Sequence, residues 1–101
     1  MPAYMISQVT VTDKAKFQSY LEKTQSVAAK FGAKPLVIAN QPKMLNGESD
    51  GHQMVFVIEF ESMDKLDSWH HSDEYQAIVQ LREEGSIQHM IAYEAMQIPG
   101  R

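Results

Sequence analysis

The chain has 101 residues, of which 44% are apolar and 22% are charged, and its formal net charge is −4. These values are typical of a single globular domain, so we expect residues 1–101 to form one unit with its own core. The nine lysines and arginines are scattered, which argues against a nucleic-acid partner, and no apolar run approaches the ~20 residues that span a membrane.

The absence of cysteine excludes disulfides, thiol nucleophiles and cysteine-ligated metals. The N-terminal sequence lacks a basic segment followed by a continuous apolar segment, so it does not resemble a signal peptide. We therefore predict a cytoplasmic protein with no membrane partner.

Two elements are predicted near the N-terminus. Ala3–Val11 is rich in apolar and β-branched residues, which favours a strand. Asp13 is a suitable N-cap, and apolar residues then recur at helical spacing from Phe17 to Phe31. Gly32 can adopt the left-handed conformation that commonly ends a helix.

The middle of the chain predicts two strands joined by a long loop. Residues 36–40 are predicted to form a short strand, and residues 41–52 are rich in turn-forming residues. Residues 53–60 are predicted to form the next strand, in which Met54 to Phe60 is an apolar run interrupted only by Glu59. A strand this apolar is expected to be covered on both faces.

The remaining elements are two helices and a fourth strand. Ser62 can cap a short helix that carries Trp69, and Ser72 can cap a second helix that runs to Gly85. Residues 87–96 then predict the last strand.

The predicted order is β-α-β-β-α-β, which is typical of an α+β, ferredoxin-like fold. In this fold the helices cover one face of a four-stranded antiparallel sheet. Side chains alternate between the two faces along each strand. This alternation leaves four apolar residues on the face that the helices do not cover, namely Tyr4, Ile6, Val55 and Val57. Such an apolar face exceeds what a soluble monomer usually exposes, so we predict a homodimer that covers it.

Several segments are similar to one protein family. They are AYMISQVTVTD near the N-terminus, VFVIEFESMDKLDSW in the middle, SDEYQ directly after it, and the pair Leu81 and Arg82. They resemble the domain of unknown function 1330 family over nearly the whole chain. That family belongs to the dimeric α+β barrel superfamily. The resemblance implies a ferredoxin-like fold and a dimer whose sheets pack face to face.

The resemblance implies no settled activity. Superfamily members include cofactor-free monooxygenases, small isomerases, dehydratases and haem-handling enzymes. The chain departs from the residues common in the family at Gln53, His70 and Asp73. A basic residue is frequent in the family at the position of Gln53. A role for such a residue in holding an anionic ligand therefore does not carry over to this chain.

Glu59 is the candidate catalytic residue. Alternation places it on the face of Val55 and Val57, toward the space between the sheet and a partner. Burial raises the pKa of a carboxyl group, and such a group can act as a general base or acid near neutral pH. The alternative is a structural role, with the carboxylate satisfied by Arg82, a tyrosine or a dimer contact.

Five further residues are candidates for ligand binding. Tyr4 and Gln8 share a strand face with Glu59 and could give an apolar cavity its polar groups. Trp69 could stack on a substrate or belong to the core, and Arg82 could bind an anion or form an ion pair. His89 could face the cavity as a base or haem ligand, or face solvent.

No metal site is predicted. The histidines are His52, His70, His71 and His89, and none of their spacings matches a known ligand motif.

We therefore predict a small-molecule-binding protein or a cofactor-free enzyme, with an apolar cavity between sheet and helices. Glu59, Tyr4, Gln8 and Arg82 are expected to be its polar groups. The alternatives are a non-catalytic dimeric module and a haem-binding, monooxygenase-like protein. No cofactor is expected, and the sequence leaves open whether the protein is an enzyme.

Overall fold

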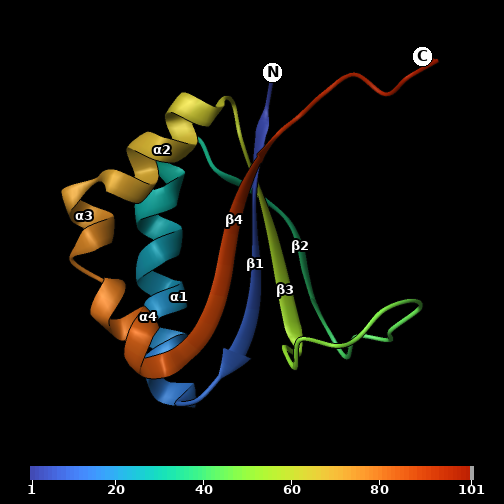
Figure 1. Cartoon of the computed structure of the whole chain (residues 1–101). Helices are drawn as coiled ribbons and strands as arrows, with labels where there is room; N and C mark the ends of the chain where they lie inside the picture. The colour runs from blue at the N-terminus through green and yellow to red at the C-terminus, as the bar shows by residue number, and fades with distance from the viewer. Residues whose placement is uncertain (101) are drawn as a thin grey trace.

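The computed structural model describes residues 1–100 (Figure 1). The elements in this range are β1 (Ala3–Val11), α1 (Lys14–Ala29), β2 (Lys34–Asn40), β3 (Met54–Phe60), α2 (Met63–His71), α3 (Asp73–Gln76), α4 (Val79–Gly85) and β4 (Ser86–Glu94). The predicted α+β order is confirmed, and all the helices lie on one side of the sheet. No helix within residues 1–100 has the length and apolar character needed to cross a bilayer.

The four strands form one antiparallel sheet in the order β2-β3-β1-β4. As predicted from the ferredoxin-like arrangement, β1 and β3 are central. The register places Tyr4 opposite both Glu59 and Tyr93. It places Gln8 opposite both Val55 and His89.

The caps of α1 and α2 form as the sequence indicates. The Asp13 side chain accepts a hydrogen bond from the backbone N–H of Lys16, and Gly32 follows α1 with a φ of 78°. The Ser62 hydroxyl accepts from the backbone N–H of Lys65 at the start of α2.

The prediction of one helix between Ser72 and Gly85 is wrong. The chain forms α3 and α4 instead, separated at Ile78, whose φ of −109° and ψ of 1° are not helical. The Ile78 N–H bonds to the Tyr75 carbonyl in a tight turn. Tyr75 and Ile78 are both buried in the core.

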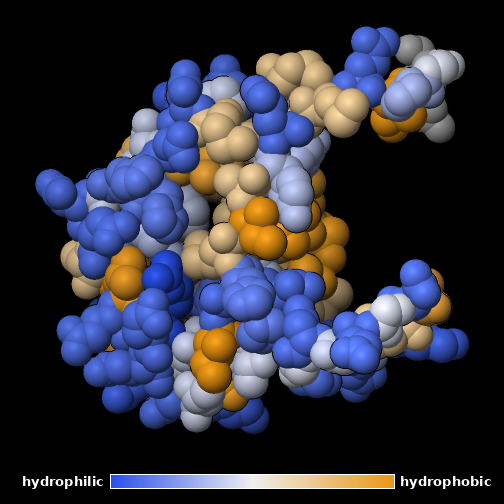
Figure 2. Space-filling view, in the orientation of Figure 1, coloured by the Kyte–Doolittle hydropathy of each residue, from blue (hydrophilic) through white to orange (hydrophobic). Residues whose placement is uncertain are grey.

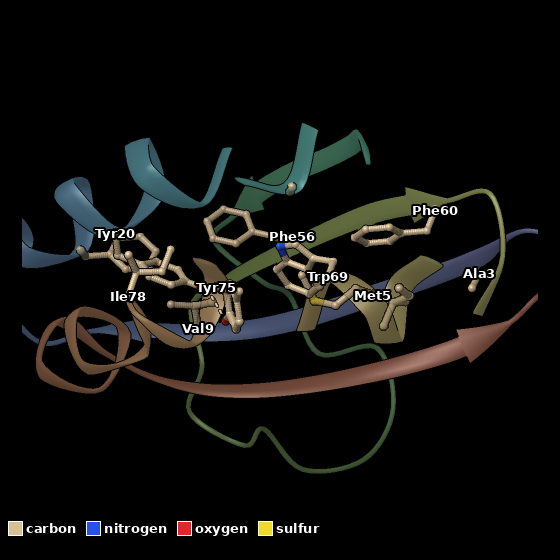
Figure 3. Packing of buried hydrophobic residues seen from close by; sticks show 12 residues of the cluster. Ala3, Met5, Val9, Tyr20, Phe56, Phe60, Trp69, Tyr75 and Ile78 are labelled. Carbon is tan, nitrogen blue, oxygen red and sulfur yellow. Dashed lines mark hydrogen bonds between the residues drawn. The ribbon is translucent and has the colours of Figure 1, made fainter. Parts of the chain in front are cut away.

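The core lies between the sheet and the helices. Odd-numbered residues of β1 face it, and Ser7 is the polar one among them at 1% exposure. Figure 3 shows aromatic side chains from α1, β3, α2 and α3 filling this layer. The buried aromatic residues are Phe17, Tyr20, Phe56, Phe60, Trp69 and Tyr75.

The opposite face of the sheet carries apolar residues that are exposed. Val37 on β2 and Ile87, Ile91 and Tyr93 on β4 are 43–59% exposed. The 41–53 loop and the C-terminal tail project from this side, and Figure 2 shows hydrophobic side chains gathered between them. A large apolar surface is therefore open on this face, as the alternation pattern predicts.

Gly85 allows α4 to approach the start of α1 closely. Its carbonyl accepts hydrogen bonds from the backbone N–H groups of Thr12, at 2.9 Å, and Asp13, at 3.2 Å. A Cβ atom at this position would lie 2.7 Å from the backbone nitrogen of Phe17. Since that contact is with backbone, a side chain here forces the two helices apart.

We predict that Gly85→Ala lowers the free energy of unfolding by about 1–3 kcal/mol, the usual cost of overpacking. Urea denaturation followed by circular dichroism measures the change. Gln80→Ala, at an exposed position of the same helix, is the control and should have little effect. Equal stability of Gly85→Ala and the parent protein would contradict the packing role of this glycine.

Candidate functional site

A cavity of about 250 Å³ lies between the sheet and α1. Its floor is formed by Met5 and Ser7 of β1, Phe56 of β3 and Trp69 of α2. All four of these side chains are buried. The cavity therefore reaches into the core.

The wall and mouth of this cavity come from α1 and β2. The inward side of α1 contributes Tyr20 and Thr24 to the wall. Gln25 and Ala29 of α1 and Ile38 of β2 also line it, and all three are exposed. The cavity thus opens between the C-terminal half of α1 and the edge strand β2.

Trp69 is held by the junction of α2 and α3. The Ser72 hydroxyl donates to the Trp69 carbonyl at 2.7 Å and accepts from the Tyr75 N–H at 3.1 Å, so one side chain joins the two helices. The indole packs against the rings of Phe60 and Tyr75, with centroid distances of 5.4 and 4.4 Å. Its position follows from the serine cap that the sequence predicts.

The indole N–H of Trp69 is buried and has no hydrogen-bond partner within residues 1–100. Figure 3 shows the indole nitrogen turned toward Phe56, which also lines the cavity. Leaving a buried donor unpaired costs about 1–3 kcal/mol. A group of this kind calls for an explanation, and a bound ligand is one.

A hydrogen-bonded network lies at one end of the cavity. The hydroxyls of Tyr20 and Tyr75 are 2.8 Å apart (Figure 3), and Arg82 Nη1 donates to the Tyr75 hydroxyl at 3.0 Å. Arg82 Nη2 also pairs with Glu83 at 2.7 Å. The network joins α1, α3 and α4 through side chains rather than through backbone.

Charge in this network is set by burial. Burial raises the pKa of Tyr20 far above its usual value, and the neighbouring Tyr75 raises it further, so Tyr20 stays protonated. Burial alone would lower the pKa of Arg82, but its bonds to Glu83 and Tyr75 raise the pKa overall. Tyr20 is therefore a hydrogen-bonding group here and does not act as a base.

A second set of polar groups runs along the sheet side of the cavity. The Ser7 hydroxyl donates to Gln88 Oε1 at 2.8 Å, and Gln88 Nε2 donates to the Ser86 hydroxyl at 2.9 Å. Ser86 in turn donates to the Arg82 carbonyl at 2.8 Å. Ser7 and Gln88 both line the cavity, so its floor is polar at this edge.

The expectation that Glu59, Tyr4 and Gln8 share a cavity with Arg82 between the sheet and helices is wrong. The three residues lie on the open face of the sheet, because the side chains of β1 and β3 alternate and the odd positions of β1 face the helices. Arg82 lies on the helix side. The sheet separates the two groups.

Of the other candidates, Trp69 lines the cavity, and His89 lies on the open face opposite Gln8. Glu59 is half-buried, in a cross-strand row with Tyr4 and Lys34. The proposed pairing of Arg82 with Glu59 is replaced by its bonds to Glu83 and Tyr75. The catalytic role of Glu59 stays a prediction.

Sequence reasoning missed Tyr20, Ser7 and Gln88 as lining residues. A signal for Ser7 was present, because it is a polar residue at an inward position of a strand whose neighbours are apolar. Tyr20 belongs to the apolar residues that recur at helical spacing along α1, a pattern that is typical of core residues. Nothing local in the sequence brings Gln88 next to Ser7.

The family model for DUF1330, a domain of unknown function, matches residues 2–96. The chain belongs to the DUF1330 family. No curated protein matches this DUF1330 chain in sequence.

Solved structures share the fold of this DUF1330 protein. RPA0582, a protein of unknown function from Rhodopseudomonas palustris, is 19% identical with a TM-score of 0.81, covering 96% of this chain and 84% of its own. SnoaB from Streptomyces nogalater, described as a cofactor-independent oxygenase, is 13% identical with a TM-score of 0.65, and the match covers 99% and 98%. A dimeric ferredoxin-like protein of unknown function from Jannaschia sp. CCS1 is 10% identical with a TM-score of 0.69, and the match covers 94% and 100%. At these identities the likeness establishes the ferredoxin-like fold.

His70 makes the stability of this DUF1330 protein depend on pH. Burial lowers its pKa below the ordinary 6.5, and His71 and Arg82 lower it further. The unfolded chain therefore binds a proton more readily than the folded one. The stability present above pH 6.5 should be lost progressively as the pH falls toward the lower folded-state pKa.

We predict that His70→Gln reduces this loss of stability on acidification, because it removes the partly buried imidazole. Thermal unfolding over a pH series below neutrality measures the effect. His71→Gln, at an exposed neighbouring position, is the matched control and should keep most of the pH dependence. If both variants lose as much stability on acidification as the parent protein does, the assignment of this pH dependence to His70 is wrong.

Proposed function

We propose that this DUF1330 protein binds a small, mostly apolar molecule in the cavity between the sheet and α1. The observation that carries the proposal is the unpaired, buried indole N–H of Trp69 at a cavity of about 250 Å³. An apolar cavity with a few polar groups is the usual make-up of a ligand site. A non-catalytic module with a filled interior would have neither feature.

The ligand should carry a hydrogen-bond acceptor at the end that reaches Trp69. The acceptor satisfies the indole N–H, while Phe56, Ala28 and Ile58 contact the apolar part. The indole N–H is covered in the free protein, so a lining side chain must move when the ligand enters. Met5 suits this role, because its side chain is unbranched and flexible.

A cofactor-free enzyme is the second candidate. It is favoured by the likeness to SnoaB, a protein described as a cofactor-independent oxygenase. In this case Tyr20 would orient the substrate as a protonated donor, since its pKa is raised by burial. Glu59, on the other face of the sheet, would take no part in this cavity.

We also propose that the protein is a homodimer whose open sheet faces pack together, and that it acts in the cytoplasm. Solved structures with the same fold are described as dimeric. At about 25 cal/mol per Å² of apolar surface, covering several hundred square ångströms supplies on the order of 10 kcal/mol before association costs. The projecting loop and tail carry exposed apolar residues, Leu45 at 88% and Met96 at 77%, which a second copy would also cover.

We predict that Trp69→Phe weakens binding of an acceptor-bearing ligand about fivefold, the loss expected for one hydrogen bond of about 1 kcal/mol. Acetylnaphthalene and ethylnaphthalene are a suitable pair of probes, because only the first has an acceptor. Isothermal titration calorimetry should show that the substitution weakens the first and leaves the second nearly unchanged.

Tyr93→Phe, on the opposite sheet face, is the control and should bind both probes as the parent does. Binding of neither probe to the parent protein, or equal losses for both probes in Trp69→Phe, would contradict the proposed site. Mass spectrometry of the ligand recovered from the complex separates binding from conversion.

We predict that Ile91→Glu converts the dimer to monomer, because Ile91 lies opposite Ile6 near the middle of the open face and a buried unpaired carboxylate is costly. Sedimentation velocity at micromolar concentration measures the change. Ala15→Glu, on the exposed side of α1, is the charge-matched control and should remain dimeric. A parent protein that sediments as a monomer would exclude the dimer.

A further inference from the structure

We propose that Asp50, His52 and His89 form a site for a divalent metal ion such as Zn²⁺. One ligand atom from each residue lies within 4.8 Å of the others. The rings of His52 and His89 are 5.1 Å apart at an interplanar angle of 62°. The cluster lies on the open side of the sheet, so it is separate from the cavity beside Trp69 and does not depend on the function proposed for it.

The sheet register and the loop together assemble this cluster. His89 is opposite Gln8 on β1. Thr10 follows Gln8 by two residues on the same strand, so its side chain faces the same side of the sheet. The Gln53 N–H bonds to the Val9 carbonyl at 3.3 Å and so ties the end of the loop to β1. His52, one residue earlier, is thereby held over the same part of the sheet as His89.

His52 is already oriented as a metal ligand usually is. Its Nδ1 is 2.9 Å from the hydroxyl of Thr10, which leaves Nε2 for an ion. Metal-bound histidines commonly donate the other ring N–H to such an oxygen, which sets the tautomer and the ring orientation.

Asp50 is placed by a local turn. One of its carboxylate oxygens, Oδ1, accepts a hydrogen bond from the His52 N–H at 3.0 Å. Gly51 between them has a φ of 86°, a conformation that glycine adopts readily. The other carboxylate oxygen remains for an ion.

Two imidazoles and one carboxylate favour zinc, cobalt or nickel over magnesium or calcium. With metal–ligand bonds of about 2.0–2.1 Å, ligand atoms lie about 3.4 Å apart, so the three groups must close by a short distance. Asp50 and His89 are exposed and can rotate to do so.

Three protein ligands leave one coordination position open. A second cavity of about 320 Å³, lined by Gln8, Glu48 and His52 among others, adjoins the site beneath the projecting loop. A metal-bound water or a small anionic ligand could occupy the open position from this cavity.

Titration of the metal-free, full-length protein with Zn²⁺ in a calorimeter tests the proposal. We expect one ion per chain, and at least a tenfold loss of affinity in both His52→Ala and His89→Ala. Co²⁺ should give visible absorption bands typical of tetrahedral or five-coordinate cobalt. Thr10→Val should weaken binding about 10–100-fold, as loss of a group that orients a ligand does.

His71→Ala is the control, because His71 is exposed on α2, away from the cluster. The Zn²⁺ affinity of this variant should match that of the parent protein. Circular dichroism confirms that each variant is folded. Because the His89 side chain is exposed, His89→Ala should perturb the fold less than His52→Ala. Absence of Zn²⁺ binding in the parent, or equal binding in the parent and in His89→Ala, would overturn the proposal.

Discussion

The alternation of side chains along β1 decides which residues reach the helix-side cavity and which reach the open face of the sheet. The strand is central in the sheet, and its odd residues face the helices while its even residues face outward. A shift of the register by one residue would exchange the two faces. Ser7 would then leave the cavity, and Gln8 would leave the open face. Both proposed sites therefore rest on the same pairing of β1 with β3 and β4.

The helix side combines an apolar core with polar groups whose partners are nearly complete. Tyr20, Tyr75 and Arg82 satisfy one another, and Ser7 is satisfied by Gln88. Such networks hold side chains in one arrangement because each unpaired group in a low-dielectric interior is costly. Against this background the unpaired N–H of Trp69 is informative, since the neighbouring groups show that the fold can supply partners.

The open side has a different physical character. Its centre is apolar, whereas Asp50, His52 and His89 gather toward the end from which the loop projects. A second copy that covers the centre would bury apolar surface and leave polar chemistry near the edge of the contact. Assembly and ion binding can thus occupy separate parts of one face.

Features that depend on neighbouring residues could be predicted from the amino-acid order, whereas features that depend on contacts between distant segments could not. The bounds of β1, the caps at Asp13 and Ser62, and the open face could be predicted, because alternation and capping are local. The break at Ile78, the absence of Glu59 from the cavity and the approach of His52 to His89 could not. These features depend on which distant segments pack together, and the energy of that packing outweighs local preference.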